Sequence, residues 1–564
     1  MGTLDWIVIG LFFMALIGII VWVVRQKQND SADYFLGGRD ATWIAIGASI
    51  FASNIGSEHL IGLAGAGASS GMAMAHWEIQ GWMILLLGWV FVPFYTRSMV
   101  YTMPEFLERR YNPQSRTILS VISLISYVLT KVAVTVYAGG LVFQQVFGIK
   151  ELWGIDFFWI AAIGLVVLTA LYTIFGGMKS VLYTSVLQTP ILLLGSLIIL
   201  VLGFKELGGW DEMMKICGAV QVNEYNDTMT QLIRSNSDPN FPWLGALIGS
   251  SVIGFWYWCT DQFIVQRVLS GKNEQEARRG TIFGAYLKLL PVFLFLIPGM
   301  IAFALHQKYI GAGGEGFLPI LANGNPNADA AFPTLVAKLL PAGMKGLVVC
   351  GILAALMSSL ASLFNSSAML FTIDFYKRFR PETPEKRLVT IGQIATIVIV
   401  ILGILWIPIM RSVGDVLYTY LQDVQSVLAP GIAAAFLLGI CWKRTSAQGG
   451  MWGLISGMII GLTRLGAKVY YSNATDASDN LFKYLFYDMN WLFFCGWMLL
   501  ICCIIVVLVS LATEAPSAEK IQGLVFGTAT PEQKAATRAS WDKWDVIHSI
   551  IILGITAAFY WYFW

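Results

Sequence analysis

The chain has 564 residues, of which 57% are apolar and only 12% are charged, against roughly 25% charged residues in an ordinary soluble protein. A mean hydropathy of +0.68 and a net charge of +2 exclude a soluble enzyme, a nucleic-acid-binding protein and a disordered chain. At about 20 apolar residues per crossing, the composition is sufficient for roughly 14 membrane-spanning helices. We therefore expect an all-α polytopic membrane protein.

Apolar segments recur along the whole chain. The first, from Trp6 to Val24, is followed by Arg25 and Lys27 and is expected to remain as a helix, not to be cleaved as a signal peptide. A short surface helix from Phe332 to Leu340 is expected before Pro341. Thirteen further segments bring the prediction to about 14 crossings, and they lie at 41–66, 72–96, 118–146, 153–175, 181–204, 242–265, 280–305, 333–373, 389–411, 414–441, 449–466, 484–513 and 544–563.

The placement of Lys and Arg predicts the orientation. With both termini outside, roughly 23 basic residues fall on inner loops and roughly 9 on outer loops, as the positive-inside rule requires. The polar stretches 205–241 and 306–332 then face outside. Loop 514–543 is cytoplasmic and carries no recognisable motif.

Signatures of catalysis and of metal binding are missing from the sequence. The four histidines are scattered, the seven cysteines give no C-x-x-C metal spacing, and there is no P-loop. No nucleophile and base occur at reachable spacing either. We therefore expect neither an enzyme nor an ATP-driven pump, and no catalytic residue.

Two apolar segments are interrupted by polar residues at mid-depth, at 52–59 and at 249–261. Such a backbone must line a cavity or the protein interior. The interruptions lie five crossings apart and run in opposite directions, which predicts an inverted five-plus-five repeat with a binding site at the midplane. The alternative is that the glycines and serines only permit close helix packing. The predicted parts are an extra N-terminal helix (1–30), the first repeat with its outer loop (31–240), the second repeat (241–445) and extra C-terminal helices (446–564).

Charged and amide side chains inside the apolar segments are candidates for that site, because a charge in mid-membrane is costly. With Tyr and Trp nearby, they offer hydrogen-bond partners for hydroxyls and aromatic faces for a sugar ring. The alternative is that Glu78 and Lys288 form a buried pair that only holds helices together. The roles of two carboxylates, Asp261 and Asp423, stay open. The full set is Glu58, His59, Glu78, Asp261, Lys288, Gln422 and Asp423.

Adjacent hydroxyls at Ser358 and Ser359 suggest a cation site. Na⁺ needs about five oxygens, which these hydroxyls and the carbonyls freed between Ala52 and Ile55 could supply. The negative end of a helix dipole favours a cation without a full carboxylate. The alternative is that the serines serve packing or bond back to their own helix.

A series of motifs occurs in order over about residues 30–450. They are Ala52-Ser53-Asn54-Ile55-Gly56-Ser57-Glu58-His59 with Gly62-Leu63-Ala64-Gly65, Thr102–Leu107, Phe175–Met178, Trp256–Gln262, Gln266-Arg267, Tyr286–Leu289, Met357–Ser362, Phe364–Ser366, Ala429–Gly431 and Trp442–Arg444. In these motifs the chain resembles the sodium/solute symporter family, and within it the sodium/glucose cotransporters more than the proline or pantothenate branches. The last 110 or so residues match in helix count only.

The resemblance implies a LeuT-like fold, Na⁺ as the coupling ion and a role for individual residues. The substrate-binding residues that it implies are Asn54, His59, Glu78, Tyr257, Trp258, Lys288 and Gln422. It implies Tyr257 as an inner gate, with Leu63 and Tyr418 as an outer gate. The sodium site that it implies consists of Ala52, Ile55, Ala355, Ser358 and Ser359.

The sequence departs from the family pattern at a second cation site. Thr184 is followed by Ser185 where relatives usually have Asp, and Ala361 replaces a hydroxyl. We therefore expect one Na⁺ per substrate. Trp77, Ile79 and Gln80 lie where relatives vary, so substrate preference is least certain there.

The prediction is a sodium-coupled symporter of a neutral hexose such as glucose or galactose, working by alternating access in the cell membrane, with a monomer sufficient. One alternative keeps the fold but carries myo-inositol, another polyol or another small solute. Another alternative is a sugar sensor or a sodium leak channel on the same scaffold. Partners other than the solute, Na⁺ and the lipid bilayer are not expected, and nucleic acid is excluded.

Overall fold

The computed structural model describes residues 1–564 apart from 27, 29, 57, 322–323, 411–416 and 474–479. Within the described residues the chain is mostly helical, with one antiparallel hairpin of β1 (Glu151–Leu152) and β2 (Ile155–Asp156). Ten helical stretches there are long and apolar enough to cross a membrane, and some of them contain two of the predicted segments. The all-α polytopic architecture is confirmed. The count of 14 crossings, the orientation and the division into repeats stay predictions.

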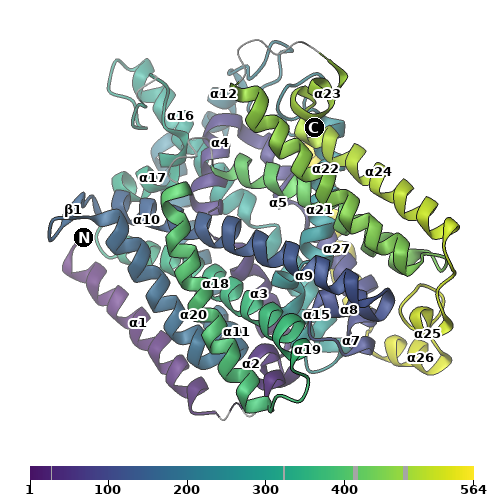
Figure 1. The fold of residues 1–564 in the computed structure, drawn as a ribbon. Helices are drawn as coiled ribbons and strands as arrows, with labels where there is room; N and C mark the ends of the chain where they lie inside the picture. The colour runs from purple at the N-terminus through teal and green to yellow at the C-terminus, as the bar shows by residue number, and fades with distance from the viewer. Residues whose placement is uncertain (27, 29, 57, 322–323, 411–416, 474–479) are drawn as a thin grey trace.

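The first part of the chain runs from α1 to α12 (Figure 1). Wider π-helical turns join several of its α-helices, at η2 (Glu58–Leu63), η4 (Leu87–Phe91) and η5 (Tyr127–Val132). Short 3₁₀ turns form η1 (Gly37–Arg39) and η3 (Gly71–Met74). The helices are α1 (Thr3–Val24), α2 (Ser31–Leu36), α3 (Trp43–Asn54), α4 (Ala64–Ser70), α5 (Ala75–Glu78), α6 (Gly81–Leu86), α7 (Val92–Ser98), α8 (Met103–Arg110), α9 (Pro113–Ser126), α10 (Ala133–Phe147), α11 (Phe157–Leu207) and α12 (Trp210–Gly218).

The second part runs from α13 to α27, with π-helical η6 (Phe255–Thr260), η7 (Val292–Leu296), η9 (Leu370–Tyr376) and η10 (Tyr484–Asp488) and the 3₁₀ turn η8 (Ala328–Ala330). The predicted surface helix before Pro341 is present as α17. The helices are α13 (Trp243–Gly254), α14 (Gln262–Leu269), α15 (Glu274–Lys288), α16 (Ile297–Gly311), α17 (Ala331–Leu339), α18 (Met344–Met369), α19 (Lys377–Phe379), α20 (Glu385–Met410), α21 (Leu417–Cys441), α22 (Ala447–Asn473), α23 (Leu481–Lys483), α24 (Trp491–Ala512), α25 (Ala518–Ile521), α26 (Pro531–Ala539) and α27 (Lys543–Tyr562).

Helix α11 joins two predicted crossings, 153–175 and 181–204, and bends sharply between them. The bend is at Gly177, whose φ of 53° and ψ of −148° suit glycine only. A side chain at Gly177 would also overlap the carbonyl of Tyr34 on α2. Glycine therefore serves both the bend and the close packing. Helix α11 packs along α18, so that residues far apart in sequence lie side by side.

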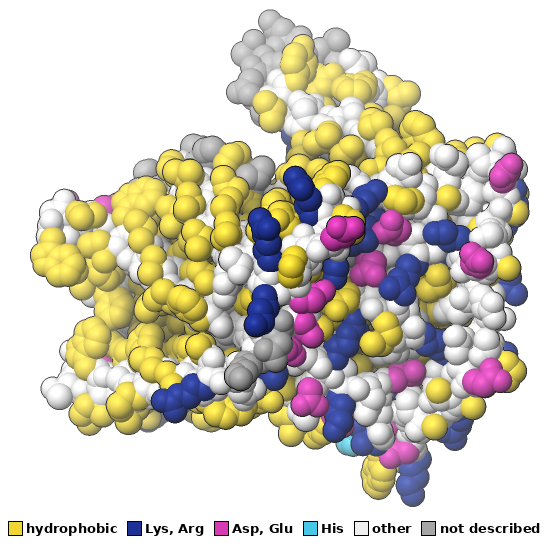
Figure 2. All heavy atoms as spheres, turned by 60° about the horizontal axis from the view of Figure 1, so that its bottom comes forward, with side chains coloured by type: hydrophobic (Ala, Val, Ile, Leu, Met, Phe, Trp, Pro, Cys, Tyr) yellow, Lys and Arg dark blue, Asp and Glu magenta, His cyan; other side chains and the backbone are white. Residues whose placement is uncertain are grey.

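The connecting segments gather at two opposite ends of the molecule. Helix α12, the end of α16 and α23 lie at the top of Figure 1, whereas α2, α19, α25 and α26 lie at the bottom. Figure 2 brings the bottom forward and shows Lys, Arg, Asp and Glu side chains crowded there beside a broad hydrophobic flank. Segments predicted to share one side of the membrane therefore do lie at the same end.

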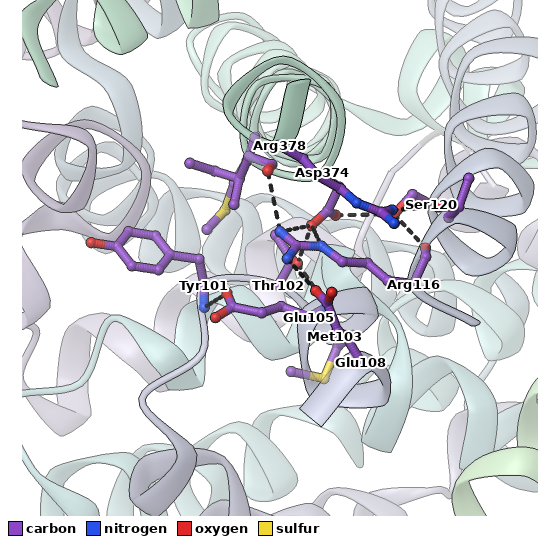
Figure 3. A network of polar contacts seen from close by, with 12 residues as sticks. Tyr101, Thr102, Met103, Glu105, Glu108, Arg116, Ser120, Asp374 and Arg378 are labelled. Atoms are coloured by element: carbon purple, nitrogen blue, oxygen red, sulfur yellow. Dashed lines mark hydrogen bonds and ion pairs between the residues drawn. The ribbon is translucent and has the colours of Figure 1, made fainter. Parts of the chain in front are cut away.

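A buried polar cluster holds neighbouring helices together at the charged end of the bundle (Figure 3). Its centre is Asp374 on η9, which accepts hydrogen bonds from Thr102 at 2.8 Å, from Arg116 Nε at 2.7 Å and from Ser120 at 3.1 Å. Arg116 also pairs with Glu108 at 2.6 Å. The cluster joins α8, α9 and η9.

Candidate functional site

Two helix interruptions create the candidate site, as the sequence predicts. Helix α3 ends at Asn54, and Ile55 has an extended backbone with ψ of 111° before η2 begins. On the opposite side, α13 widens into η6, and Asp261 is extended with ψ of 127° before α14. Both interruptions leave backbone groups unpaired in mid-protein, which requires a polar surrounding.

A polar cavity of about 50 Å³ lies beside these interruptions. All seven residues predicted to bind substrate line this cavity. The complete lining is Asn54, Glu58, His59, Trp77, Glu78, Gln80, Ile253, Gly254, Tyr257, Trp258, Lys288, Gln422 and Gln425.

An ion pair between Glu78 and Lys288 forms the polar centre of the cavity. The Lys288 ammonium lies 2.5 Å from Glu78 Oε2 and donates a hydrogen bond to Asn54 Oδ1 at 3.1 Å. Nε2 of His59 lies 3.4 Å from the same carboxylate oxygen. Asn54 in turn donates to the hydroxyl of Tyr257 at 3.1 Å. One network thus spans both interruptions and α15, with its charges balanced between Glu78 and Lys288.

Two polar atoms of the cavity wall have no partner among the described residues. They are Oε1 of Gln422 and Nε1 of Trp77, and both side chains are more than nine-tenths buried. Buried polar groups are nearly always hydrogen-bonded. Because the wall of one cavity carries both an unpaired acceptor and an unpaired donor, we expect a ligand with hydroxyl groups to form hydrogen bonds with both.

Several lining residues were missed as site residues by sequence reasoning. Glu58 was noticed as an intramembrane charge but given no role. Gln425 follows Gln422 by three positions, a spacing that puts both on one helix face and could have revealed it. Gln80 accepts a hydrogen bond from Trp258 at 3.2 Å and donates to a backbone carbonyl of α13. The remaining missed residues are Trp77, Ile253 and Gly254.

A second cavity, of about 40 Å³, also borders Tyr257. Four residues line both cavities and so form the partition between them: Glu58, Tyr257, Gln422 and Gln425. Ser359 of the predicted sodium site lines the second cavity. An aromatic ring in such a partition is in the position that an inner gate needs. Leu63 of the predicted outer gate is fully buried in η2, and the side chain of Tyr418 lies outside the described residues.

The predicted sodium site lies where α3 and α18 meet. Helix α3 contributes Ala52 and Ile55 at its interrupted end, where the last carbonyls have no helical partner. On α18, Ala355, Ser358 and Ser359 are buried, and the hydroxyl of Ser358 has no partner among the described residues. A hydrogen bond of 2.6 Å between Ser53 and Ser362 holds the two helices together. Free carbonyls and an unpaired hydroxyl fit a Na⁺ ion.

The two carboxylates of open role lie outside the first cavity. Asp261 pairs with Lys131 at 2.7 Å, accepts a hydrogen bond from Tyr127, and caps α14. Asp423 pairs with Lys468 of α22. Both carboxylates thus pair with lysines of neighbouring helices.

An interrupted pair of membrane helices around a polar cavity, with oxygen ligands for a cation beside it, defines a secondary transporter of the LeuT-like class. The chain belongs to the sodium:solute symporter family, whose model matches residues 34–457. It is 38% identical over 539 residues to the human sodium/myo-inositol cotransporter 2, with 93% of this chain and 79% of that protein covered. It is 37% identical over 558 residues to sodium/glucose cotransporter 4 of Danio rerio, covering 96% of this chain and 83% of that one.

Among solved structures, a Na⁺-coupled sialic acid symporter in a substrate-bound outward-open state is similar, with a TM-score of 0.73 at 22% identity. The match covers 92% of this chain and 99% of that chain, and it shows the fold alone. The comparisons confirm the predicted family, the LeuT-like fold, Na⁺ as the coupling ion and a multi-pass membrane location. The relatives named here are transporters, not enzymes.

Proposed function

We propose that this sodium-coupled symporter carries a neutral, polyhydroxylated six-membered ring. The observation that carries the proposal is the Glu78–Lys288 pair, which Asn54 and His59 join at the wall of the polar cavity. A negatively charged solute would need an unpaired cation in the cavity wall, and Lys288 is already neutralised by Glu78. Hydroxyl groups, in contrast, can both donate to and accept from such a network.

Two kinds of ring fit this description. A hexose such as glucose or galactose is the first, and the aromatic faces of Tyr257 and Trp258 suit its apolar C–H face. A cyclitol is the second, favoured by the similarity to the human sodium/myo-inositol cotransporter 2. Sodium coupling is common to both.

The proposed mechanism is alternating access. Na⁺ bound by Ala52 and Ile55 of α3 and by Ala355, Ser358 and Ser359 of α18 would hold the interrupted helix in a shape that binds the solute. Leu63 and Tyr418 would then close the outer side, and rotation of Tyr257 would open the inner side. Linkage requires that the solute raise the affinity for Na⁺ by the same factor that Na⁺ raises the affinity for the solute.

A stoichiometry of one Na⁺ per solute is part of the proposal. At the positions of a second cation, Ser185 donates to the carbonyl of Val181 in its own helix at 2.6 Å, and Ala361 offers no hydroxyl. Ser362 is bonded to Ser53. These groups leave no charged partner for a second ion. Moving one positive charge into the cell gains about 2.3 kcal/mol per 100 mV of membrane potential, so the accumulation of the solute depends on that potential.

The test is uptake into proteoliposomes of purified protein with an inward Na⁺ gradient, against choline as the control cation. Radiolabelled glucose, galactose, myo-inositol and proline form the panel. We expect uptake of at least one ring, none of proline, and a rate that rises hyperbolically with Na⁺ concentration. A rate that rises with the square of that concentration contradicts the single ion. Sodium currents without solute uptake would instead establish a sensor or a leak channel.

A further inference from the structure

Two carboxylates among the described residues line the cavities on either side of Tyr257, Glu58 and Glu78, and of these Glu58 makes no hydrogen bond or ion pair with another residue. It begins η2 directly after the first interruption, is half-buried, and lines both cavities. Its side chain folds over Gly56, where a methyl group would lie 2.5 Å from Glu58 Oε2. The glycine therefore leaves room for this carboxylate at the partition.

The neighbouring cations already have other partners. Lys131, which shares the second cavity with Glu58, lies 2.7 Å from Asp261 and within 5.2 Å of the centres of four aromatic rings. Lys288 forms an ion pair with Glu78 and donates a hydrogen bond to Asn54. Both lysines attract Glu58 from a distance, but neither forms a close ion pair with it, so its carboxylate stays available at the wall of both cavities.

We propose that Glu58 contacts the solute directly and selects a cyclitol over an aldohexose. This inference rests on the function proposed above. An ionised carboxylate accepts hydrogen bonds but donates none, so it requires O–H groups on the part of the ring that faces Tyr257. A cyclitol has a hydroxyl on every ring carbon. An aldopyranose has a ring oxygen that carries no hydrogen, so one edge of it repels an acceptor.

Other acceptors reinforce this selection. Oε1 of Gln422 is unpaired and lines the same two cavities as Glu58, and Glu78 lies in the same cavity wall. Acceptors therefore approach the ring from three elements: η2, α5 and α21. A ring with donors around its whole circumference satisfies all three, whatever its rotation in the cavity.

The first experiment compares uptake of myo-inositol and glucose by the wild type, Glu58→Gln, Glu58→Ala and the control Glu224→Gln, in which an exposed loop carboxylate is changed in the same way. We expect the wild type to prefer myo-inositol. In Glu58→Gln the ratio of kcat/KM for myo-inositol to that for glucose should fall roughly 10- to 100-fold, the value of a hydrogen bond to a charged group. Glu224→Gln should leave the ratio unchanged.

A second measurement serves if the variants fold poorly. Deoxyinositols, each lacking one hydroxyl, compete with myo-inositol for the wild type and for Glu58→Ala. We expect one position at which loss of the hydroxyl weakens competition in the wild type but not in the variant, the pattern of a direct contact in a double-mutant cycle. In the wild type alone, the deoxyinositol that lacks the hydroxyl at that position should compete more weakly than the other deoxyinositols.

The outcomes separate the two proposals. Wild-type preference for glucose, or an unchanged ratio in Glu58→Gln with Na⁺-driven uptake intact, overturns the role of Glu58 and leaves the symport of a neutral ring standing. Equal weakening by every deoxyinositol also overturns it. Absence of Na⁺-driven uptake of either ring overturns both.

Discussion

Two buried ion-pair clusters in this protein differ in how completely their polar groups are satisfied. Around Asp374, one carboxylate accepts hydrogen bonds from Thr102, Arg116 and Ser120, and Asp374 does not line the cavity at Glu78 (Figure 3). Around Glu78, the pair with Lys288 is equally tight, but an empty cavity adjoins it and unpaired groups face that cavity.

The difference separates structure from function. A fully satisfied polar network fixes the packing of helices, whereas a partly satisfied one is costly unless something else completes it. Burial of an ion pair alone would not have told the two apart, since replacing a buried pair by apolar residues is often neutral. The observation that distinguishes the two clusters is the presence of unpaired polar atoms beside the cavity at Glu78.

The largest expected effect comes from breaking the pair at the cavity. Lys288→Ala leaves the carboxylate of Glu78 buried and uncompensated, a cost of about 3–5 kcal/mol, and removes a donor from the cavity wall. Na⁺-driven uptake should fall by at least about 100-fold. Proteoliposome uptake is the measurement, with Lys272→Ala as the control because Lys272 is exposed.

Lys288→Met combined with Glu78→Gln tests whether this pair is only structural. The double variant keeps shape and removes both charges, so its thermal midpoint should recover toward that of the wild type while uptake stays lost. Recovery of uptake together with stability would mean that the pair only holds helices together.

The second prediction breaks the satisfied cluster. Asp374→Ala leaves Arg116 without its main partner, which should cost about 3–5 kcal/mol of stability and lower the thermal midpoint of the purified protein. Because Asp374 does not line the cavity, the KM for the solute should change less than twofold in the protein that remains folded. Arg116→Met with Asp374→Leu should recover most of the midpoint. A large rise in KM with an unchanged midpoint would contradict the distinction drawn here.

Much of this site could be predicted from the sequence, because its signals are exceptions to an apolar background. A charge or a glycine-rich interruption in a membrane segment is rare enough to be informative, which is how Glu78, Lys288 and the ends of α3 and α13 were found. Family motifs then supplied Asn54, His59 and Tyr257. The structure brings these residues together around one cavity.

The remaining parts depend on three-dimensional neighbours that no local pattern encodes. Trp77 looks like any core aromatic in the sequence, and only its unpaired Nε1 beside the cavity distinguishes it. The partner of Asp261, Lys131, lies 130 positions away in the sequence, and only the structure brings the two together. The bend at Gly177 falls between two predicted crossings, 153–175 and 181–204, but its direction depends on the packing of Gly177 against Tyr34, which no local pattern encodes.

The third prediction removes one unpaired acceptor and leaves the ion pair intact. Gln422→Ala deletes the amide oxygen that has no partner among the described residues, so the KM for the solute should rise roughly 10-fold, as expected for one lost hydrogen bond in a buried site. Na⁺ affinity, followed by the Na⁺ dependence of tryptophan fluorescence without solute, should change little. Equal weakening of both would show that Gln422 acts on the sodium site or on folding.

The smallest effect concerns a carboxylate that is unpaired but borders neither of these cavities. Asp329 on η8 packs against Gly65 of α4, and its Oδ1 has no partner among the described residues. Burial raises the pKa of Asp329 from 3.8 to about 6. The folded state thus holds this proton more tightly than the unfolded state, so the free energy of unfolding falls as the pH rises from about 4 to 6 and stays lowered above that.

Asp329→Asn removes this titration without changing the shape of the side chain. The thermal midpoint of the variant should therefore exceed that of the wild type by roughly 1–3 °C at pH 7.5 and by nothing at pH 4. The difference between the two proteins should develop between these pH values, with uptake unchanged throughout. A lower midpoint for the variant at pH 7.5, or a loss of uptake, would show that the charged carboxylate of Asp329 has a partner of its own. An unpaired group would then cease to be a reliable mark of a site.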